Sequence, residues 1–425
     1  MMICVFAALL GAAMFGPYIQ NVTDTGGLVV WEGEDLSPVV RAVVAPNGEF
    51  ALKADTVRVG DDDRVRVRLA VRGVEPGSHV RGHLLDTDST IVPLSSFSFT
   101  TPDPDAAVRF LYFGDSGSCS GTQRTLSRLI NKLDADFAAH AGDVIYPSGE
   151  RKRYDECFLA MYRPMLSRTP FFPVIGNHDI RTSDAAPYLE IFDLPIVKGI
   201  PENHRERYYS FRWGPIFWLA LDSNDALEMR DTQCSDGREV SDKNRYETVK
   251  NISLELREES HQYRWLVKEL ASAPAECWIV INLHAPPLST TYHESYCGLY
   301  KALQAASLEA GRKIDIVISG HEHDYQRSWP IRMDVPGDQN DPASKKGRGE
   351  SWPMEFDAAE GTFFIVSGGG GGRKMFRPSP DEGVAWIARG EKKNHVMQFF
   401  VDDRSILLQS IDSREVLLDQ VRIVR

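Results

Sequence analysis

The sequence has few cysteines, no excess of basic residues and no long hydrophobic run. Its 425 residues include 6 cysteines, too few for a disulfide-built fold, and no Cys-X-X-Cys pair of the kind that structural zinc sites use. Lys and Arg number 48 against 60 Asp and Glu, a formal net charge of −12. Because such a chain repels polyanions, we expect no nucleic acid as its general partner. Any metal must be held by ligands other than cysteine pairs.

The longest uncharged apolar run covers residues 3–16 (ICVFAALLGAAMFG). It is shorter than the ~18 residues of a membrane span and ends in small residues. We therefore predict a cleaved signal sequence over residues 1–15, a secreted or periplasmic location and no stable membrane span. No Lys or Arg precedes the run, which leaves open a missing upstream start or a retained apolar anchor. Cleavage would remove Cys4, and of the five remaining cysteines at least one would stay free or pair with another chain.

Residues 26–101 contain short β-branched runs and no convincing helix. Residues 65–69 (VRVRL) alternate with the period of two of a half-buried strand. The pattern predicts a small β-sandwich over residues 16–101. Pro102 and Pro104 favour extended neighbours and predict a linker over residues 102–107. The predicted strands are Leu28–Trp31, Val39–Val44, Thr56–Val71 and Ser95–Thr101.

From residue 108 to residue 425, continuous apolar runs alternate with helical patterns. Such runs suit strands buried on both faces, and Leu126, Leu129, Ile130 and Leu133 have the spacing of one helix face. We predict an α/β domain, in which ligand sites lie past the carboxyl ends of strands. The apolar runs are 108–113, 137–141, 171–175, 216–221, 278–283, 314–318 and 362–366, followed by 395–401, 405–411 and 416–424; a second helix is predicted over 263–270.

Five polar clusters begin where apolar runs stop. Each is weak alone, since an Asp after a strand is often a helix cap and Gly-Asn is an ordinary turn pair. Together they hold two carboxylates, a phenol, an amide oxygen and three imidazoles, which would fill two metal sites that share one bridge. The clusters are Gly114–Gly117, Gly142–Tyr146, Gly176–Asp179, Asn282–His284 and Gly320–His323.

In this order the clusters resemble the signature of the purple acid phosphatases, within the calcineurin-like metallophosphoesterase superfamily: DxG, GDxxY, GNH[DE], VxxH and GHxH. The one departure is Ile281, which replaces the usual valine. Residues 16–21 (GPYIQN) and the β-rich stretch after them are similar to the fibronectin-III-like domain of long plant and bacterial members. The resemblance implies such a sandwich followed by an α/β domain of two packed mixed sheets flanked by helices.

Residue by residue, the resemblance implies two metal sites bridged by Asp143. A phenol has a pKa near ~10, so a tyrosine ligand requires a strong Lewis acid, which favours Fe(III) at the first site. The second site suits a divalent ion, and the sequence does not choose between Fe, Zn and Mn. The implied ligands are Asp115, Asp143, Tyr146 and His323 for the first metal, and Asp143, Asn177, His284 and His321 for the second.

The resemblance further implies an acid phosphatase that cleaves small phosphate monoesters with a metal-bound hydroxide. A centre of charge +2 before that hydroxide suits a phosphate oxyanion. His178, next to Asn177, is implied as the proton donor or phosphate-binding group. His293, nine residues after His284, matches a substrate-pocket histidine by spacing; an exposed loop histidine, or Glu294 as the polar partner, are the alternatives.

Other functions remain open from the residues alone. The same metals would serve a phosphodiesterase, and a Fe(III)/Fe(II) pair would support redox chemistry. An inert binding protein is disfavoured by the complete ligand set. Some members of the resembling family dimerise, so a homodimer is compatible with the pattern. We predict that His140 is a hydrogen-bonded core histidine, that Asp222 caps or supports a strand end, and that residues 368–372, which lack a P-loop ending, form an irregular strand exit near the site.

Overall fold

The computed structural model describes most of the chain outside the first residues. Residues 1–14, which carry most of the predicted signal sequence, lie outside the described part, and the first strand begins at Phe15, the last residue of that prediction. The described residues are 15–34, 41–45, 55–58, 64–85, 91, 95–224, 256–257, 260–291, 293, 295–334, 354–372 and 386–425.

The N-terminal strands form two antiparallel sheets. One has the order β1-β2-β5-β4 and the other β3-β6-β7. The sheets touch where the rings of Trp31 and Phe97 lie 5.7 Å apart, edge to face. The predicted β-rich character of this segment is confirmed, while its likeness to a fibronectin-III sandwich stays a prediction. The strands are β1 (Phe15–Thr23), β2 (Gly26–Glu34), β3 (Arg41–Ala45), β4 (Asp55–Arg58), β5 (Arg64–Arg72), β6 (His79–Leu85) and β7 (Phe97–Thr100).

The sequence prediction was wrong on four of these strands. The single run 56–71 is two strands, β4 and β5, which pair antiparallel with each other. β1 and β6 were missed: β1 begins inside the apolar run assigned to the signal, and β6 carries Arg81, Gly82 and His83, which weaken any β pattern. Residues 102–107, the predicted linker, contain no helix or strand, and the domain limits themselves stay a prediction.

The described residues from Val108 onward build two mixed seven-stranded sheets, in the orders β10-β9-β8-β19-β20-β21-β16 and β11-β12-β13-β14-β17-β15-β18. In the first, β8, β9 and β10 are parallel and β19 runs antiparallel beside β8. In the second, β12, β13, β14 and β17 are parallel. The first-sheet strands are β8 (Val108–Phe113), β9 (Phe137–His140), β10 (Phe171–Pro173), β16 (Met354–Asp357), β19 (His395–Val401), β20 (Ser405–Asp412) and β21 (Leu417–Val424). The second-sheet strands are β11 (Tyr209–Trp213), β12 (Ile216–Ala220), β13 (Trp278–Asn282), β14 (Ile316–Ser319), β15 (Tyr325–Ser328), β17 (Phe363–Ser367) and β18 (Ile387–Glu391).

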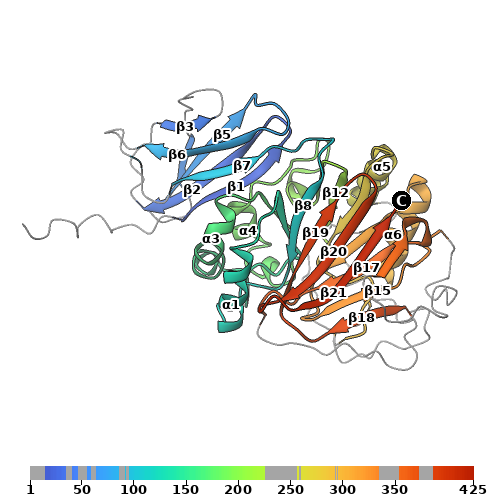
Figure 1. Ribbon diagram of the computed structural model, residues 1–425. Helices are drawn as coiled ribbons and strands as arrows, with labels where there is room; N and C mark the ends of the chain where they lie inside the picture. Colours follow the sequence, from blue (N-terminus) through green and yellow to red (C-terminus); the bar gives the residue numbers. More distant parts are fainter. Residues whose placement is uncertain are drawn as a thin grey trace, which may run out of the picture.

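The strands of the two sheets are seen in Figure 1, and aromatic side chains pack between the sheets. Phe110 of β8 stacks on Phe399 of β19 at 4.3 Å and meets Trp218 of β12 edge-on at 5.4 Å. Successive residues of β13 alternate between two hydrophobic clusters: Trp278 lies in the cluster between the sheets and Ile279 in the cluster on the outer face. Burial on both faces explains why these strands read as continuous apolar runs. The predicted pair of packed mixed sheets is confirmed.

Helices flank the sheets on their outer sides. Leu266 of α5 and Leu303 of α6 belong to the outer cluster of the second sheet, and Leu126 of α1 belongs to the core cluster that includes the first sheet. Within the described parts of the chain, no helix is both long and apolar enough to cross a membrane. The helices are α1 (Gly121–Ile130), α2 (Arg151–Tyr154), the π-helix η1 (Asp155–Leu159), α3 (Ala160–Leu166), α4 (Ala186–Ile191), α5 (His261–Ser272), α6 (Cys297–Ala310) and the 3₁₀ turns η2 (Asp179–Arg181), η3 (Glu202–His204) and η7 (Ala358–Glu360).

One predicted helix is shorter than expected, and another helix was not predicted. α1 begins where the Ser120 side chain accepts a hydrogen bond from the backbone N–H of Gln123, and it ends at Ile130. Leu133, which was predicted to lie on one face of this helix, therefore lies beyond its end. α6 was missed because its apolar residues are not confined to one stripe: Leu299 and Leu303 are buried while Leu308 is 46% exposed.

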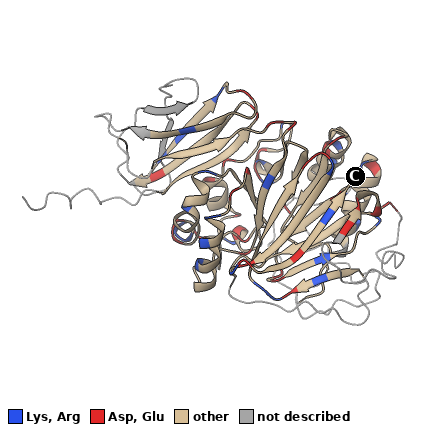
Figure 2. Ribbon diagram, viewed as in Figure 1, with Lys and Arg blue, Asp and Glu red and all other residues tan. Residues whose placement is uncertain are grey.

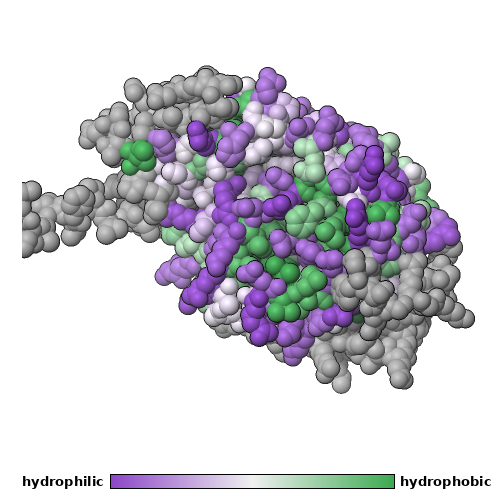
Figure 3. All heavy atoms as spheres, in the orientation of Figure 1, coloured by the Kyte–Doolittle hydropathy of each residue, from purple (hydrophilic) through white to green (hydrophobic). Residues whose placement is uncertain are grey.

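The surface mixes charges of both signs. Basic and acidic residues are interspersed along the ribbon in Figure 2. On the face shown in Figure 3, hydrophilic residues predominate and hydrophobic ones gather near the middle of the view.

Candidate metal centre

The polar clusters meet at one edge of the two sheets. Asp115 lies two residues past β8, Asp143 three residues past β9 and His284 two residues past β13. Because parallel strands end at the same edge, their following loops converge. The backbone bends sharply there: φ is 56° at Asp115, 51° at Asp143 and 68° at His321. Positive φ is uncommon for residues with a side chain and marks backbone held in place by its surroundings.

Two glycines allow the loops to approach one another. A Cβ on Gly176 would lie 2.1 Å from the backbone nitrogen of Asp143, and one on Gly320 would lie 2.5 Å from Oδ2 of Asp115. No side chain fits at either distance. Gly176 and Gly320 therefore allow their loops to approach the loops of Asp143 and Asp115. Any larger residue would push these candidate ligands apart.

Three donor atoms form a first group. The Tyr146 hydroxyl lies 3.0 Å from Oδ1 of Asp115 and 2.8 Å from Nε2 of His323. Nε2 of His323 is 3.4 Å from the same Asp115 oxygen. The first, second and fifth clusters thus meet around one point, as the predicted first metal site requires.

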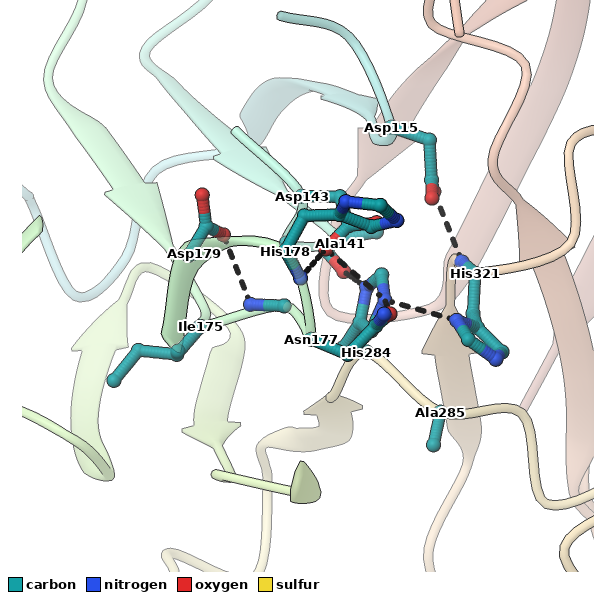
Figure 4. A network of polar contacts seen from close by, with 12 residues as sticks. Asp115, Ala141, Asp143, Ile175, Asn177, His178, Asp179, His284, Ala285 and His321 are labelled. Carbon is teal, nitrogen blue, oxygen red and sulfur yellow. Dashed lines mark hydrogen bonds and ion pairs between the residues drawn. The ribbon is translucent and has the colours of Figure 1, made fainter. Parts of the chain in front are cut away.

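Four donor atoms form a second group beside it (Figure 4). Nε2 of His284 lies 3.0 Å from Oδ1 of Asn177, 3.2 Å from Nδ1 of His321 and 3.5 Å from Oδ1 of Asp143. Donor atoms of Asp115, Asp143 and His284 all lie within 4.8 Å of one another. Asp143 therefore stands between the two groups, and the structure brings all seven predicted ligands together.

The chemistry of these donors fits a pair of cations. Burial raises the pKa of the Tyr146 phenol well above 10, and the carboxylates of Asp115 and Asp143 raise it further. Acidic groups that face one another disfavour each other's charged forms, and a cation between them reverses this effect. Carboxylate, phenolate, amide and imidazole donors without sulfur suit Fe, Zn or Mn. The residues present thus fit a binuclear metal centre.

Asp179 ties two of the ligand-bearing loops together, a role the sequence analysis missed. Its carboxylate accepts hydrogen bonds from the backbone N–H groups of Gly176 (2.9 Å), Val144 (3.1 Å) and Ile145 (3.1 Å). Burial and the nearby Asp143 raise its pKa to about 7, against the effect of those N–H donors. The signal was available in the sequence, since Asp179 is the last residue of the Gly-Asn-His-Asp cluster.

His140 and Asp222 support the site without joining it, as predicted. Nδ1 of His140 accepts from the backbone N–H of Gly142 at 3.1 Å, so Nε2 carries the proton and faces the Ser116 hydroxyl at 2.9 Å. Burial, followed by the charge of His284, lowers the pKa of His140 to about 3. Asp222 accepts from the backbone N–H of Asn224 at 3.1 Å just past β12.

His178 points Nε2 of its ring toward Asp143 at the centre. Its backbone N–H donates to Oδ1 of Asp143 at 2.8 Å, and Nδ1 lies 2.6 Å from the carbonyl oxygen of Pro147. A carbonyl only accepts, so Nδ1 carries a proton. Nε2 is then 3.9 Å from Oδ2 of Asp143, and the side chain is 23% exposed. An incoming ligand can reach this nitrogen from solvent.

His293 lies against the second donor group. Its ring centroid is 4.1 Å from that of His321, its backbone N–H donates to the Glu322 carboxylate, and its Nδ1 is 3.4 Å from Oε2 of Glu322. The side chain is 9% exposed, so the alternative of an exposed loop histidine is wrong. Glu294 lies outside the described residues. Glu322, fully buried between two predicted ligands, was not singled out in the sequence.

A family model described as calcineurin-like phosphoesterase matches residues 108–325. The chain belongs to the calcineurin-like phosphoesterase family. Within the family, this phosphoesterase is 28% identical over 241 residues to purple acid phosphatase 22 of Arabidopsis thaliana, covering 54% of this chain and 48% of that protein. It is 23% identical over 315 residues to a nucleotide pyrophosphatase/phosphodiesterase of Hordeum vulgare, covering 68% and 77%. A probable inactive purple acid phosphatase 27 of Arabidopsis thaliana is 24% identical over 322 residues, covering 68% and 46%.

The fold is shared with a solved phosphatase. Purple acid phosphatase PPD1 from yellow lupin seeds superposes with a TM-score of 0.71 at 18% identity, covering 97% of this chain and 74% of that one. The phosphoesterase spans about half the length of the first curated relatives that it matches.

The glycine run of this phosphoesterase follows β17 and lies beside the site, as predicted. A Cβ on Gly368 would lie 2.7 Å from Oδ2 of Asp115, and one on Gly372 would lie 2.8 Å from the His323 ring. Residues 368–372 therefore pass directly over the first donor group and leave no room there for side chains.

Proposed function

We propose that this phosphoesterase hydrolyses phosphate monoesters at acid pH with a binuclear metal centre, in the manner of the purple acid phosphatases. One observation carries the proposal: two groups of donor atoms meet at Asp143, and Nε2 of His178 faces the same point. The carboxylates, phenol, amide and imidazoles of both groups are present. This complete set argues against an inert binding protein.

Asp115, Asp143, Tyr146 and His323 would hold the first metal, and Asp143, Asn177, His284 and His321 the second. Tyr146 favours Fe(III), because only a strongly Lewis-acidic ion displaces the proton of so weakly acidic a phenol. Fe, Zn and Mn are all compatible with the second set of donors. When bound, the metals supply a cationic seat for phosphate and lower the pKa of water.

His178 is proposed to serve the leaving group. Because the Pro147 carbonyl holds the proton of Nδ1, the second nitrogen is the one that exchanges a proton or binds a phosphate oxygen. His293 contacts Glu322 and lies beside His321. It would therefore border the phosphate-binding position on the side of the second metal. We propose that it contacts the bound phosphate ester.

A phosphodiesterase is the second candidate. The barley relative is named as a nucleotide pyrophosphatase/phosphodiesterase and is matched over 77% of its length. Metals at the same donors would serve either ester, and the loops around the seat would decide between them.

Rates on matched substrates test both candidates. The metal-loaded protein should show a higher kcat/KM on an aryl phosphomonoester than on the corresponding diester, with an optimum below pH 7. A diester preference or an alkaline optimum would overturn the acid phosphatase proposal and support the second candidate. Absence of activity on both esters, in protein shown to contain two metals, would overturn both.

We also propose that the protein is exported. Cys119 and Cys157 form a disulfide, a bond that persists mainly in oxidising compartments. Cys277 is buried and has no disulfide. Fractionation of producing cells tests the proposal: the mature protein should appear in the medium or periplasm, lacking residues 1–15, and recovery of the intact chain from the cytoplasm would contradict it.

A further inference from the structure

The candidate second-metal ligand His321 has a tyrosine behind it. The Tyr296 hydroxyl lies 3.0 Å from Nε2 of His321, on the side opposite the donor group, while Nδ1 of His321 lies 3.2 Å from Nε2 of His284. Both rings are buried, with Tyr296 fully so and His321 4% exposed. The phenol therefore contacts a ligand through the nitrogen that does not face the metal position.

The two histidines of this donor group are oriented by different partners. Nδ1 of His284 lies 2.7 Å from the carbonyl oxygen of Ala141, and because a carbonyl only accepts, that nitrogen holds the proton and Nε2 is left for a metal. His321 needs the opposite tautomer, with its proton on Nε2 and Nδ1 unprotonated. Its partner is a hydroxyl, which can accept that proton's hydrogen bond.

Tyr296 is held in place by the backbone on both sides. Its N–H donates to the carbonyl of Pro286 at 3.0 Å, and its own carbonyl accepts from Leu299 (2.9 Å) and Tyr300 (3.1 Å) in the first turn of α6. Pro286 is two residues past His284. The phenol is thus a fixed feature of the loop that carries one ligand, and it contacts the other.

We propose that Tyr296 is a positioning residue for the second metal: its hydroxyl oxygen accepts a hydrogen bond from Nε2–H of His321 and so presents the unprotonated Nδ1 to the metal position. The inference rests on the proposed binuclear centre. Partners that orient ligating histidines in this way typically contribute about 10–100-fold in metal affinity. The Tyr296 hydroxyl contacts His321, a candidate ligand of the second metal, so we expect its removal to weaken the second metal.

The substitution Tyr296→Phe removes only the hydroxyl. Its matched control is Tyr300→Phe, which removes a hydroxyl one turn further along α6 from a buried ring that packs on Phe364 at 5.5 Å. Protein with the first site occupied is titrated with Zn(II) against a competing chelator, and bound metal is counted by mass spectrometry. We expect about 10–100-fold weaker binding of the second metal in Tyr296→Phe, with unchanged first-site content and wild-type affinity in Tyr300→Phe.

A second measurement needs no metal. ¹⁵N chemical shifts of the His321 ring in the metal-free protein report which nitrogen carries the proton, and Tyr296→Phe should reduce the population protonated on Nε2. Equal zinc affinity in wild type and Tyr296→Phe, or an equal loss in Tyr300→Phe, would overturn the positioning role while leaving the binuclear centre intact. Wild-type protein that binds no second metal would overturn the proposed function itself.

Discussion

The backbone N–H of His178 donates a 2.8 Å hydrogen bond to Oδ1 of Asp143, the carboxylate that stands between the two donor groups. This hydrogen bond joins the loop after β10 to the loop after β9 at the point where both would contact the metals. Through this bond, the residue proposed to serve the leaving group and the residue proposed to bridge the metals keep one relative position. Function at His178 thus depends on Asp143 in two ways, through geometry and through charge.

Replacing the proposed bridging residue Asp143 should abolish activity and lower the metal content. Asp143→Asn keeps the size of the side chain and one oxygen but loses the charge that two cations would share. We expect activity at the background level and less than two metals per protein, measured by mass spectrometry and by phosphate release. Asp134→Asn is the matched control, an exposed acid that precedes β9 at its opposite end. Wild-type metal content and turnover in Asp143→Asn would show that the bridging assignment is wrong.

Removing the His178 imidazole should affect substrates according to their leaving groups. His178→Asn retains the backbone N–H to Asp143, so metal content should stay at the wild-type level. General acid catalysis typically contributes about 10²–10⁴-fold, and an alkyl phosphate needs it more than an activated aryl phosphate does. We expect kcat to fall within that range on the alkyl ester and much less on the aryl ester. An equal fall on both would assign His178 to phosphate binding instead.

A buried ionic network should make the N-terminal sheets essential to stability. Glu32 of β2 is fully buried, accepts from Tyr18 at 2.5 Å and from Nε of Arg66 at 2.9 Å, and pairs with Arg151 at the start of α2. Glu32→Gln would leave the Arg66 guanidinium without its carboxylate, while Arg151 would keep its pair with Asp155. Breaking a buried pair costs about 3–5 kcal/mol.

Denaturant titration measures that loss in free energy of unfolding. The control is Glu75→Gln, an exposed position, where a change within about 0.5 kcal/mol is expected. If Glu32→Gln were as stable as Glu75→Gln, the network would not contribute to stability. It would then only fix how β2 packs against α2.

Acid should destabilise the protein partly through His395. This histidine is fully buried between Ser367 and the carbonyl of Lys393, and burial lowers its pKa to about 4. A histidine in the unfolded chain has a pKa near ~6.5. Between that pH and about pH 4, the unfolded state therefore binds a proton at His395 and the folded state does not. Stability contributed by the neutral ring is therefore present above pH 6.5 and lost as the pH falls toward 4, by about 2 kcal/mol at pH 5.

His395→Gln keeps a donor and an acceptor but removes the titration. We expect the difference in Tm between pH 8 and pH 5 to be smaller in this variant than in wild type. His79→Gln, at an exposed position, should keep the wild-type difference. A wild-type pH dependence in His395→Gln would mean that other groups account for the acid sensitivity.

Much of the candidate site was predictable because its chemistry needs particular residue types at strand ends. Apolar runs revealed β8, β9, β13 and β14 within about two residues at each end, since strands buried on both faces leave an unambiguous local pattern. The donors follow directly, so Asp115 and the other six predicted ligands could be named before any fold was known. Asp179 and Glu322 stand inside the predicted clusters, but their roles could not be predicted because they depend on backbone N–H groups of other loops.

The sequence by itself determined the doubly buried strands that lead to the site, such as β8, β9, β13 and β14, and the candidate metal ligands that follow them. It did so because both signals lie in neighbouring residues. Only the tertiary structure decided which strands and residues contact one another. Examples are β19 beside β8, Cys119 with Cys157, Glu32 with Arg151, and Tyr296 behind His321. Such pairings join residues far apart in the chain. Local periodicity reports that a side chain is buried, but the packing of the whole core selects its partner.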